Sequence, residues 1–492
     1  MDGGKLRPTD EQAAIVTAAR SAQRLCIQAG AGTGKTSTLN LVAEDMRGKS
    51  ALYLAYNGTI ATEARASFPS HVQCRTIHSL AHEAVGYQYR HRLNGGRQTS
   101  RQVAKILDTR WVNLRRDVSV TPAQVARIAV ETVKWFCYSA DEEIRFKHVP
   151  QQNGIAGEAH KELVSSVLPY ARKVWADLLN TKGVIRFEHD HYLKMWALRR
   201  PLLAADVVML DEAQDSNPVV TQLVQDQSQS QLIAVGDSCQ SMYGWRGAVD
   251  ALSGWDADVE LFLSQSWRFG QPVADEANKW LSQIDTPMRL KGNPNKQSIL
   301  AALETPNAVL CRTNAEAMRQ VMSMLDEGRK VSLVGKGSSI RALAEAAAEL
   351  KAGRRTGHSE LYVFATWAAL QDYAENDAAG RDLKPFVDLI DAHGTDEIIA
   401  AIDALVPEDQ AQTVVSTVHT AKGREWDSVQ IAGDFAEPKP DEDGAQGIAK
   451  ADAMLGYVAV TRARVVLDRG GMEWIDKFIT TPGTGVGRLL AG

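Results

Sequence analysis

The sequence lacks long hydrophobic runs. No window of its 492 residues holds the ~18 uninterrupted apolar residues that a membrane-spanning helix needs. The opening residues, Met1–Lys5, contain no apolar stretch of the kind found in secretion signals. We therefore expect a cytoplasmic protein without a membrane partner. At 44% apolar and 23% charged residues, the composition is that of a globular protein, and the length exceeds one hydrophobic core, so two to four domains are expected.

Cysteine is also scarce. The five cysteines are odd in number, scattered and never spaced as Cys-x-x-Cys, so we expect reduced thiols and not a disulfide framework or a zinc site. They are Cys26, Cys74, Cys137, Cys239 and Cys311. The one histidine-rich spot, Glu188–His191, has no partner Cys or His at zinc-like spacing, and we expect no transition metal there.

The net charge of -5 is unevenly distributed along the chain. Residues 86–200 carry 20 Lys and Arg against 11 Asp and Glu, whereas residues 345–410 carry 5 against 14. The basic stretch is either a solvated helical surface or a face that contacts phosphates, and composition alone does not separate the two.

Short apolar segments alternate with stretches of helical pattern. This alternation predicts parallel sheets covered by helices, with functional groups at the carboxyl ends of the strands. The predicted strands are Arg24–Ala29, Ala51–Ala55, Val207–Leu210, Leu232–Val235, Ala308–Leu310, Val331–Val334, Val414–Ser416 and Val429–Ala432.

Two insertions are expected within these sheets. Residues 86–200 are mainly helical in pattern, with a capped start at Thr121–Pro122, and they carry the basic excess. The acidic, alanine-rich stretch 345–410 interrupts a second sheet that begins near residue 300.

The strongest motif is a phosphate loop. Ala29–Thr36 follows a predicted strand and precedes a helical stretch, with Ala29 in place of the usual leading glycine. The glycines of such a loop let backbone N–H groups surround phosphates, Lys35 reaches the terminal phosphates and Thr36 ligates Mg²⁺. The loop residues are Ala29, Gly30, Ala31, Gly32, Thr33, Gly34, Lys35 and Thr36. A Gly-rich turn without ligand is the alternative.

An apolar strand delivers two adjacent carboxylates at its end. Asp211 and Glu212 follow Val207–Leu210, 176 residues beyond Lys35. Asp211 would hold Mg²⁺ and Glu212 would accept a proton from the attacking water. Phosphoryl transfer also needs further cations, for which Arg268 and Arg462 are candidates; spacing alone favours a surface salt-bridge partner for each, since arginines are common.

In this order, the segments resemble the motif set of superfamily 1A helicases of the UvrD, Rep and PcrA type. Besides the phosphate loop and the acidic strand, the matching segments are Leu6–Gln12, Arg75–Leu80, Val235–Ala248, Ser416–Trp426 and Gly456–Arg464. Ile77, Cys239 and Gly244 are substitutions within them. The stretch His189–Trp196 looks closest to the F-box DNA helicase branch, although no F-box is expected ahead of the motor here.

The resemblance covers nearly the whole chain and implies an α/β fold class: two RecA-like P-loop domains with parallel sheets, each carrying a mainly helical insertion. The implied parts are domain 1A (1–85 plus 201–285), basic insertion 1B (86–200), domain 2A (286–344 plus 411–492) and a reduced acidic insertion 2B (345–410). That last segment takes the place of a much larger subdomain in UvrD.

The resemblance also implies roles for individual residues. Gln12 would read adenine, Trp267 would stack on it, Glu425 would bind the ribose and Gln240 would sense the terminal phosphate. Arg268 and Arg462 would close over that phosphate, with ATP between the two sheets. The nucleic-acid contacts implied are Tyr56, His78, Tyr243, Trp245, Arg246, Thr417 and His419, although core packing is the alternative for each aromatic residue.

The sequence thus predicts an ATP- and Mg²⁺-dependent motor on single-stranded DNA and single/double-strand junctions, with 3′ to 5′ polarity implied by the resemblance. Two alternatives stay open: a translocase that displaces bound proteins with little unwinding, and a regulatory nucleotide switch. The sequence does not identify the pathway, and DNA repair and recombination are both open. It also leaves open the choice of DNA over RNA and the presence of a further protein subunit. Only about 25 residues follow Leu467, so no nuclease domain is expected.

Overall fold

Apolar strand runs build two separate parallel sheets in this computed structural model. The described residues are 7–93, 95, 98–114, 118–152, 154–241, 251–335, 337–358, 360–362, 364–376, 383–440 and 446–479. By its internal contacts the chain divides into a first unit, Met1–Ala29 with Gly34–Leu263, and a second, Gly30–Thr33 with Ser264–Gly492.

The sheet of the first unit has six strands in the order β3-β2-β6-β7-β1-β8, and every pairing in it is parallel. The strands are β1 (Arg24–Ala29), β2 (Ala51–Ala55), β3 (Val72–Thr76), β6 (Val207–Leu210), β7 (Gln231–Gly236) and β8 (Val259–Leu263). The helices that alternate with them are α1 (Asp10–Ala19), α2 (Lys35–Asp45), α3 (Gly58–Ser67), α4 (Ile77–Ala84) and α10 (Pro218–Gln225).

Both faces of this sheet are buried. Successive side chains of a strand point to opposite faces, so Leu54 joins one apolar cluster while Tyr53 joins the other. The same division separates Leu210 from Met209. Burial on both faces explains why the strands have continuous apolar runs, not alternating ones.

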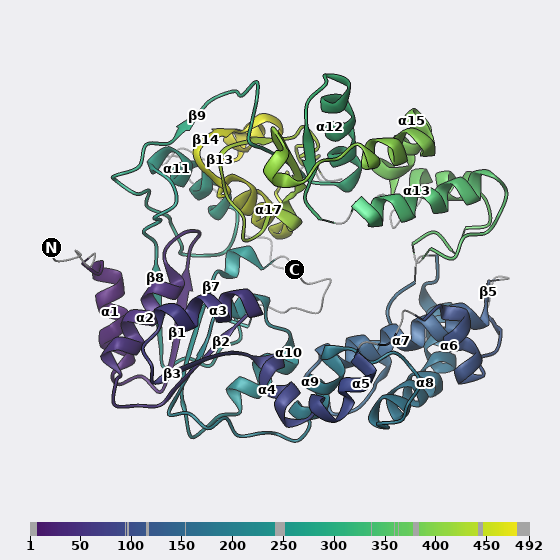
Figure 1. The fold of residues 1–492 in the computed structure, drawn as a ribbon. Coiled ribbons are helices and arrows are strands. Elements are labelled where there is room, and N and C mark those ends of the chain that lie inside the picture. The colour runs from purple at the N-terminus through teal and green to yellow at the C-terminus, as the bar shows by residue number, and fades with distance from the viewer. Residues whose placement is uncertain are drawn as a thin grey trace. The chain divides into compact units, whose positions relative to one another are not determined.

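The predicted helical insertion lies between α4 and β6. Its elements are η1 (Gly86–Tyr89), α5 (Arg90–Leu93), α6 (Ser100–Leu107), β4 (Val112–Asn113), β5 (Ser119–Val120), α7 (Pro122–Tyr138), η2 (Phe146–His148), α8 (Gly157–Leu179) and α9 (His189–Ala197). Thr121 caps α7 as predicted, with Pro122 in its first turn. These helices lie together beside α4 (Figure 1). The insertion therefore shares one continuous core with a face of the sheet.

The second unit has its own six-stranded parallel sheet, in the order β11-β12-β10-β13-β14-β9. The strands are β9 (Ile299–Leu300), β10 (Ala308–Cys311), β11 (Val331–Leu333), β12 (Thr413–Thr417), β13 (Trp426–Ile431) and β14 (Ala463–Asp468). The accompanying helices are α11 (Gln271–Leu281), α12 (Asn314–Asp326), α16 (Val418–Ala421), α17 (Lys450–Val460) and the turn η8 (Gly470–Phe478).

The acidic insertion of the second unit is helical as well. It comprises α13 (Gly337–Lys351), α14 (Trp367–Asn376), α15 (Lys384–Asp403) and the turn η7 (Glu408–Gln410), between β11 and β12. Its apolar side chains, including Trp367 and Ile390, join the same cluster as Val309 and Val415 of the sheet. The α/β class with parallel sheets and helical insertions is thus confirmed, whereas the exact four-part division stays a prediction.

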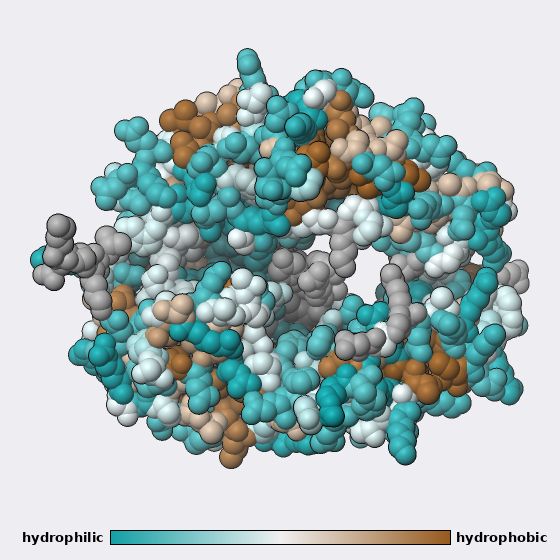
Figure 2. Space-filling view, in the orientation of Figure 1, coloured by the Kyte–Doolittle hydropathy of each residue, from teal (hydrophilic) through white to brown (hydrophobic). Residues whose placement is uncertain are grey.

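The surface agrees with a globular protein. Hydrophilic residues predominate on the face seen in Figure 2, with apolar residues in separate patches. Within the described part of the chain, no helix is both long and apolar enough to cross a membrane. The five cysteines are buried and none is bonded to another.

Candidate functional site

The phosphate loop joins β1 to α2 as predicted. Gly32 and Gly34 adopt φ angles of 72° and 81°, in the left-handed region that a side chain disfavours, so these two positions require glycine. Gly34 immediately precedes α2, and no side chain in the described residues caps that helix start. The first N–H groups of α2, together with the helix dipole, suit this position to phosphate oxygens.

The acidic pair lies beside the start of α2. Lys35 Nζ is 2.8 Å from Glu212 Oε2, and Thr36 Oγ1 donates to Asp211 Oδ2 at 3.3 Å. Parallel pairing brings this about, because only β7 separates β6 from β1 and these strands end at the same edge of the sheet. The two predicted pairs, which lie far apart in the sequence, therefore form one cluster within the first unit.

Glu212 has an unusual backbone. Its φ and ψ are 50° and 43°, a left-handed conformation that non-glycine residues rarely adopt. Such strain persists where the surrounding structure enforces it, and it is concentrated at functional sites.

The cluster carries more negative than positive charge. Burial and the adjacent carboxylate of Glu212 raise the pKa of Asp211, against the effect of Lys35. Burial acts to lower the pKa of Lys35, but the charges of Glu212, Asp211 and Asp237 outweigh it and raise the pKa. The described residues contain no group of three or more His, Cys, Asp or Glu side chains that could hold a metal ion by themselves. The contact of the Thr36 hydroxyl with Asp211 offers two oxygen ligands, of the kind that Mg²⁺ takes together with water and substrate phosphates.

Two residues of the cluster were missed by sequence reasoning. The hydroxyl of Tyr53, on β2, donates to Asp211 Oδ2 at 2.5 Å, and burial, with the charge of Asp211 next, raises the pKa of Tyr53. Gln214 is fully buried; its Nε2 donates to Glu212 Oε2 at 2.7 Å, and its Oε1 accepts from the N–H of Asp237 at 2.9 Å. Gln214 lay within the acidic segment, where a closer reading could have found it, whereas Tyr53 had no signal in the sequence.

Gln240 and Gln12 are also in the first unit. Gln240 Nε2 donates to Asp237 Oδ2 at 2.5 Å, and Asp237 directly follows β7, the strand that pairs with β6. Gln12 Nε2 donates to Thr38 Oγ1 at 3.1 Å, and its Oε1 accepts from the N–H of Thr9. Gln12 therefore caps α1 and ties it to α2, and adenine reading by this residue stays a prediction.

The predicted arginines belong to the second unit. Arg268 Nε is 2.5 Å from Glu425 Oε2, and its Nη1 donates to the carbonyl of Thr461 at 2.9 Å. Trp267 precedes Arg268, and its N–H donates to the carbonyl of Gly32 at 2.8 Å, within the same unit. Arg268 and Glu425 are thus brought together, although their phosphate and ribose contacts stay predictions.

Arg462 is buried, whereas its spacing in the sequence allowed a surface salt-bridge partner. The side chain is 1% exposed, and its guanidinium donates to the carbonyls of Val458 and Arg424 and to Thr461 Oγ1. A buried guanidinium needs such acceptors, because an unpaired charge is costly in the interior. The surface alternative is therefore wrong for Arg462.

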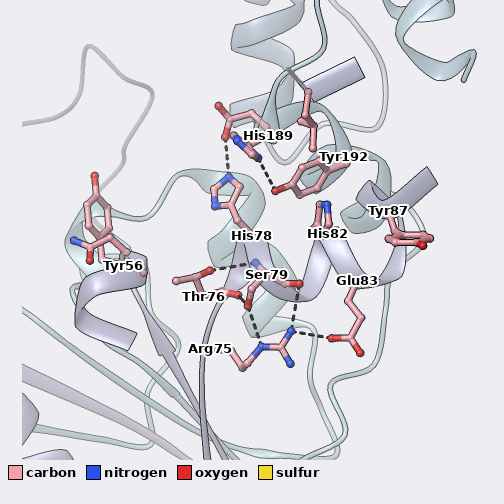
Figure 3. A pocket seen from close by; sticks show the side chains of 14 residues that line it. Tyr56, Arg75, Thr76, His78, Ser79, His82, Glu83, Tyr87, His189 and Tyr192 are labelled. Atoms are coloured by element: carbon pink, nitrogen blue, oxygen red, sulfur yellow. Dashed lines mark hydrogen bonds and ion pairs between the residues drawn. The ribbon is translucent and has the colours of Figure 1, made fainter. Parts of the chain in front are cut away.

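The predicted nucleic-acid residues fall in different places. Tyr56 is 46% exposed, which contradicts core packing for this residue, and it lines an open pocket together with His78 (Figure 3). Thr417 and His419 lie in the second unit at the β12–α16 junction, where Thr417 Oγ1 is 2.9 Å from Thr420 Oγ1 and burial lowers the pKa of His419. Tyr243, Trp245 and Arg246 lie outside the described residues.

Comparisons with known proteins agree with this geometry. A protein family described as an AAA domain matches residues 12–246. The chain is 28% identical over 510 residues to "F-box DNA helicase protein 1" of Schizosaccharomyces pombe, covering 93% of this chain and 56% of that protein. It is 28% identical over 486 residues to "F-box DNA helicase 1" of Gallus gallus, covering 90% of this chain and 46% of that protein.

The chain thus spans about half the length of the curated relatives it matches. The resemblance to helicases is therefore confirmed: residues 12–246 match an AAA domain, and the chain is similar, over most of its length, to proteins named F-box DNA helicases.

Proposed function

We propose that this protein is an ATP-hydrolysing motor that moves along single-stranded DNA in the 3′ to 5′ direction and separates strands. The observation that carries the proposal is the cluster in which Lys35 contacts Glu212 and Thr36 contacts Asp211. A helix start for phosphates, a lysine for their charge and a carboxylate positioned as a general base form a hydrolytic set. The relatives that are named DNA helicases support a nucleic-acid track as the purpose of that hydrolysis.

In this proposal Thr36 and Asp211 hold Mg²⁺, which when bound supplies positive charge to the phosphates. Glu212 accepts the proton of the attacking water, and Gln214 orients Glu212 through the hydrogen bond described above. The motif positions also assign nucleotide contacts to Gln240 of the first unit and, within the second unit, to Trp267, Arg268, Glu425 and Arg462. These assignments follow the motif positions, and single substitutions test each of them.

The decisive experiment is steady-state ATP hydrolysis titrated with DNA and RNA oligomers at two salt concentrations. We expect DNA to stimulate hydrolysis and salt to weaken the stimulation, because phosphate contacts release counterions. Glu212→Gln should lose nearly all hydrolysis in all conditions, whereas Glu63→Gln, at an exposed position of α3, should not. An ATPase rate that no DNA or RNA oligomer changes would contradict the proposed motor and favour the regulatory switch.

One observation favours a second function, displacement of bound proteins with little unwinding. The helical insertion of residues 345–410 is acidic, with 5 Lys and Arg against 14 Asp and Glu, and an acidic surface disfavours contact with a duplex backbone. A tailed duplex, tested with and without a protein bound to its single-stranded tail, distinguishes the two. Fast protein release without strand separation would select this second function.

A further inference from the structure

The outer edge of the second sheet exposes apolar side chains. β9 is the terminal strand of that sheet, and among the described strands it pairs with β14 alone. Ile299 and Leu300 of β9 are 54% and 38% exposed, and Val465 of β14 is 43% exposed. Figure 2 shows apolar residues at the upper left, where Figure 1 places β9 and β14. An apolar patch on a mainly hydrophilic surface indicates contact with another molecule, and the proposed function uses none of these side chains.

The backbone of β9 also has groups that point away from the sheet. The N–H of Ala301 donates to the carbonyl of Leu467 at 3.1 Å, and the N–H of Leu303 donates to Asp468 Oδ2 at 3.0 Å. Successive residues of a strand direct their backbone groups to opposite sides, so the N–H and carbonyl of Leu300 face away from β14. These two groups are placed to pair with a further strand.

This edge has few of the usual protections. Proteins commonly protect an edge strand with charged side chains, proline or a covering segment. The stretch Ile299–Leu303 contains neither a charged residue nor proline, and its side chains up to Ala302 are exposed. β9 is a short strand of 2 residues, which limits what a pairing there contributes. We therefore expect association through this edge to be weak and reversible.

Opposite charges flank the apolar stretch symmetrically. Lys296 lies as far before Leu300 in the sequence as Glu304 lies after it, and both side chains are exposed. Lys296 Nζ donates to the carbonyl of Arg268 at 3.2 Å, and an ammonium group has further N–H groups for another acceptor. An antiparallel copy of the same stretch, centred on Leu300, therefore presents a carboxylate to each lysine.

We propose that two copies of this chain associate through β9, paired antiparallel with Leu300 of one copy opposite Leu300 of the other. The two leucines then exchange both backbone hydrogen bonds, as opposed residues of a hydrogen-bonded antiparallel pair do. Lys296 of each copy comes opposite Glu304 of the other, and the exposed apolar side chains of the two edges pack together.

The symmetry of the stretch is the reason for choosing a second copy as the occupant. A two-fold contact needs a surface that is complementary to itself, and the order of cation, apolar strand and carboxylate around Leu300 meets that requirement. An unrelated strand would use the same backbone groups but would not need this arrangement of charges. The inference goes beyond the proposed function, because the pairing requires neither nucleotide nor nucleic acid.

Sedimentation velocity of the full chain, without nucleotide or DNA, tests the association between about 1 and 100 μM. We expect the dimer fraction to rise with concentration. Lys296→Glu and Glu304→Lys should each raise the dissociation constant roughly tenfold or more, because both ion pairs between the copies become like-charge contacts. Lys330→Glu, at an exposed lysine next to β11 on the opposite edge of the sheet, is the matched control and should leave the association unchanged.

An equimolar mixture of the two charge variants gives the sharper test. When the Lys296→Glu variant pairs with the Glu304→Lys variant, every cation again faces a carboxylate, so the mixture should regain the association of the parent protein. Mixing would not restore an association that was lost through local unfolding. Thermal midpoints of the variants provide an independent measure of folding.

A cross-link tests the register. In the proposed pair the Cα atoms of the two Leu300 residues lie about 5.5 Å apart, within the range of a disulfide. Leu300→Cys should therefore yield a covalent dimer on mild oxidation, against a background of five buried cysteines. Ala302→Cys falls opposite Ser298, which puts its two copies about 13 Å apart, and it should not cross-link.

Three outcomes would overturn the proposal. The parent protein would stay monomeric over the whole concentration range, the charge variants would associate as the parent does, or their mixture would stay monomeric. Equal cross-linking of Leu300→Cys and Ala302→Cys would overturn the register. A failure of DNA to stimulate ATP hydrolysis, with the dimer intact, would contradict the proposed function alone.

Discussion

Lys35 Nζ lies 2.8 Å from Glu212 Oε2, so the lysine expected to contact a terminal phosphate is bonded to the carboxylate expected to activate water. Both side chains are mostly buried, at 17% and 27% exposed. A phosphate that takes over the lysine leaves the carboxylate without its cation and therefore more basic toward water. In the proposed function, occupation of the phosphate loop and activation of Glu212 are therefore coupled through this ion pair.

The first prediction separates binding from turnover at this ion pair. Glu212→Gln should bind a fluorescent ATP analogue at least as well as the parent protein, because a competing negative charge is gone, and should hydrolyse ATP roughly 100- to 10,000-fold more slowly. Lys35→Ala should lose binding itself. Equilibrium titration and single-turnover hydrolysis measure the two effects. Parent-like turnover in Glu212→Gln would remove it from the role of general base.

The second prediction concerns Tyr53. Tyr53→Phe removes the hydroxyl that donates to Asp211. The carboxylate then loses a hydrogen bond worth about 1.5–3 kcal/mol and is no longer held in its orientation by that bond. Hydrolysis should then need several-fold more free Mg²⁺ for half-maximal rate. Tyr89→Phe is the control, since that buried hydroxyl donates to the Leu179 carbonyl in the insertion. It should cost stability without changing the Mg²⁺ dependence, and equal shifts in both variants would contradict the role of Tyr53.

The third prediction concerns Gln214. Gln214→Ala should reduce kcat for ATP roughly tenfold or more with little change in KM, because Gln214 holds the base and not the nucleotide. Gln227→Ala removes a comparably buried glutamine that bonds the Pro201 and Leu223 carbonyls, far along the chain from the phosphate loop. Both variants should lose about 1–3 kcal/mol of stability. A similar fall of kcat in both would assign the effect of Gln214 to folding.

The fourth prediction is a pH dependence of stability. Burial lowers the pKa of His191 to about 4, below the ordinary 6.5. The unfolded chain therefore binds more protons at this histidine between pH 6.5 and 4, so its contribution is complete above pH 6.5 and is lost as the pH falls toward 4. The full loss is about 3 kcal/mol.

His191→Gln isolates that contribution. The variant should be less stable than the parent protein at pH 7, because His191 Nδ1 accepts from the N–H of Glu188, and the difference should shrink as the pH falls to 4.5. Urea unfolding at several pH values measures it. Parallel stability curves for the two proteins would show that His191 titrates alike in the folded and unfolded chain.

Strand prediction succeeded where apolar runs have clear ends. The strands β1, β2 and β6 cover the predicted residues, because each is buried on both faces and bounded by polar residues or a turn. β13 begins at Trp426, three residues before the prediction, because Asp427 and Ser428 interrupt the apolar pattern. β3 was not predicted, since an edge strand with an exposed residue, Gln73, has no continuous apolar run.

The sequence by itself determined the phosphate loop, the acidic pair and the order of the motifs, because these depend on neighbouring residues: glycines for a left-handed turn, a lysine at a helix start, and carboxylates after an apolar strand. Only the tertiary structure decided which side chains from distant segments meet. Tyr53 reaches Asp211 because β2 pairs with β6, and Asp190 reaches His78 because α9 packs on α4. Such contacts arise from strand order and helix packing, which no local pattern encodes.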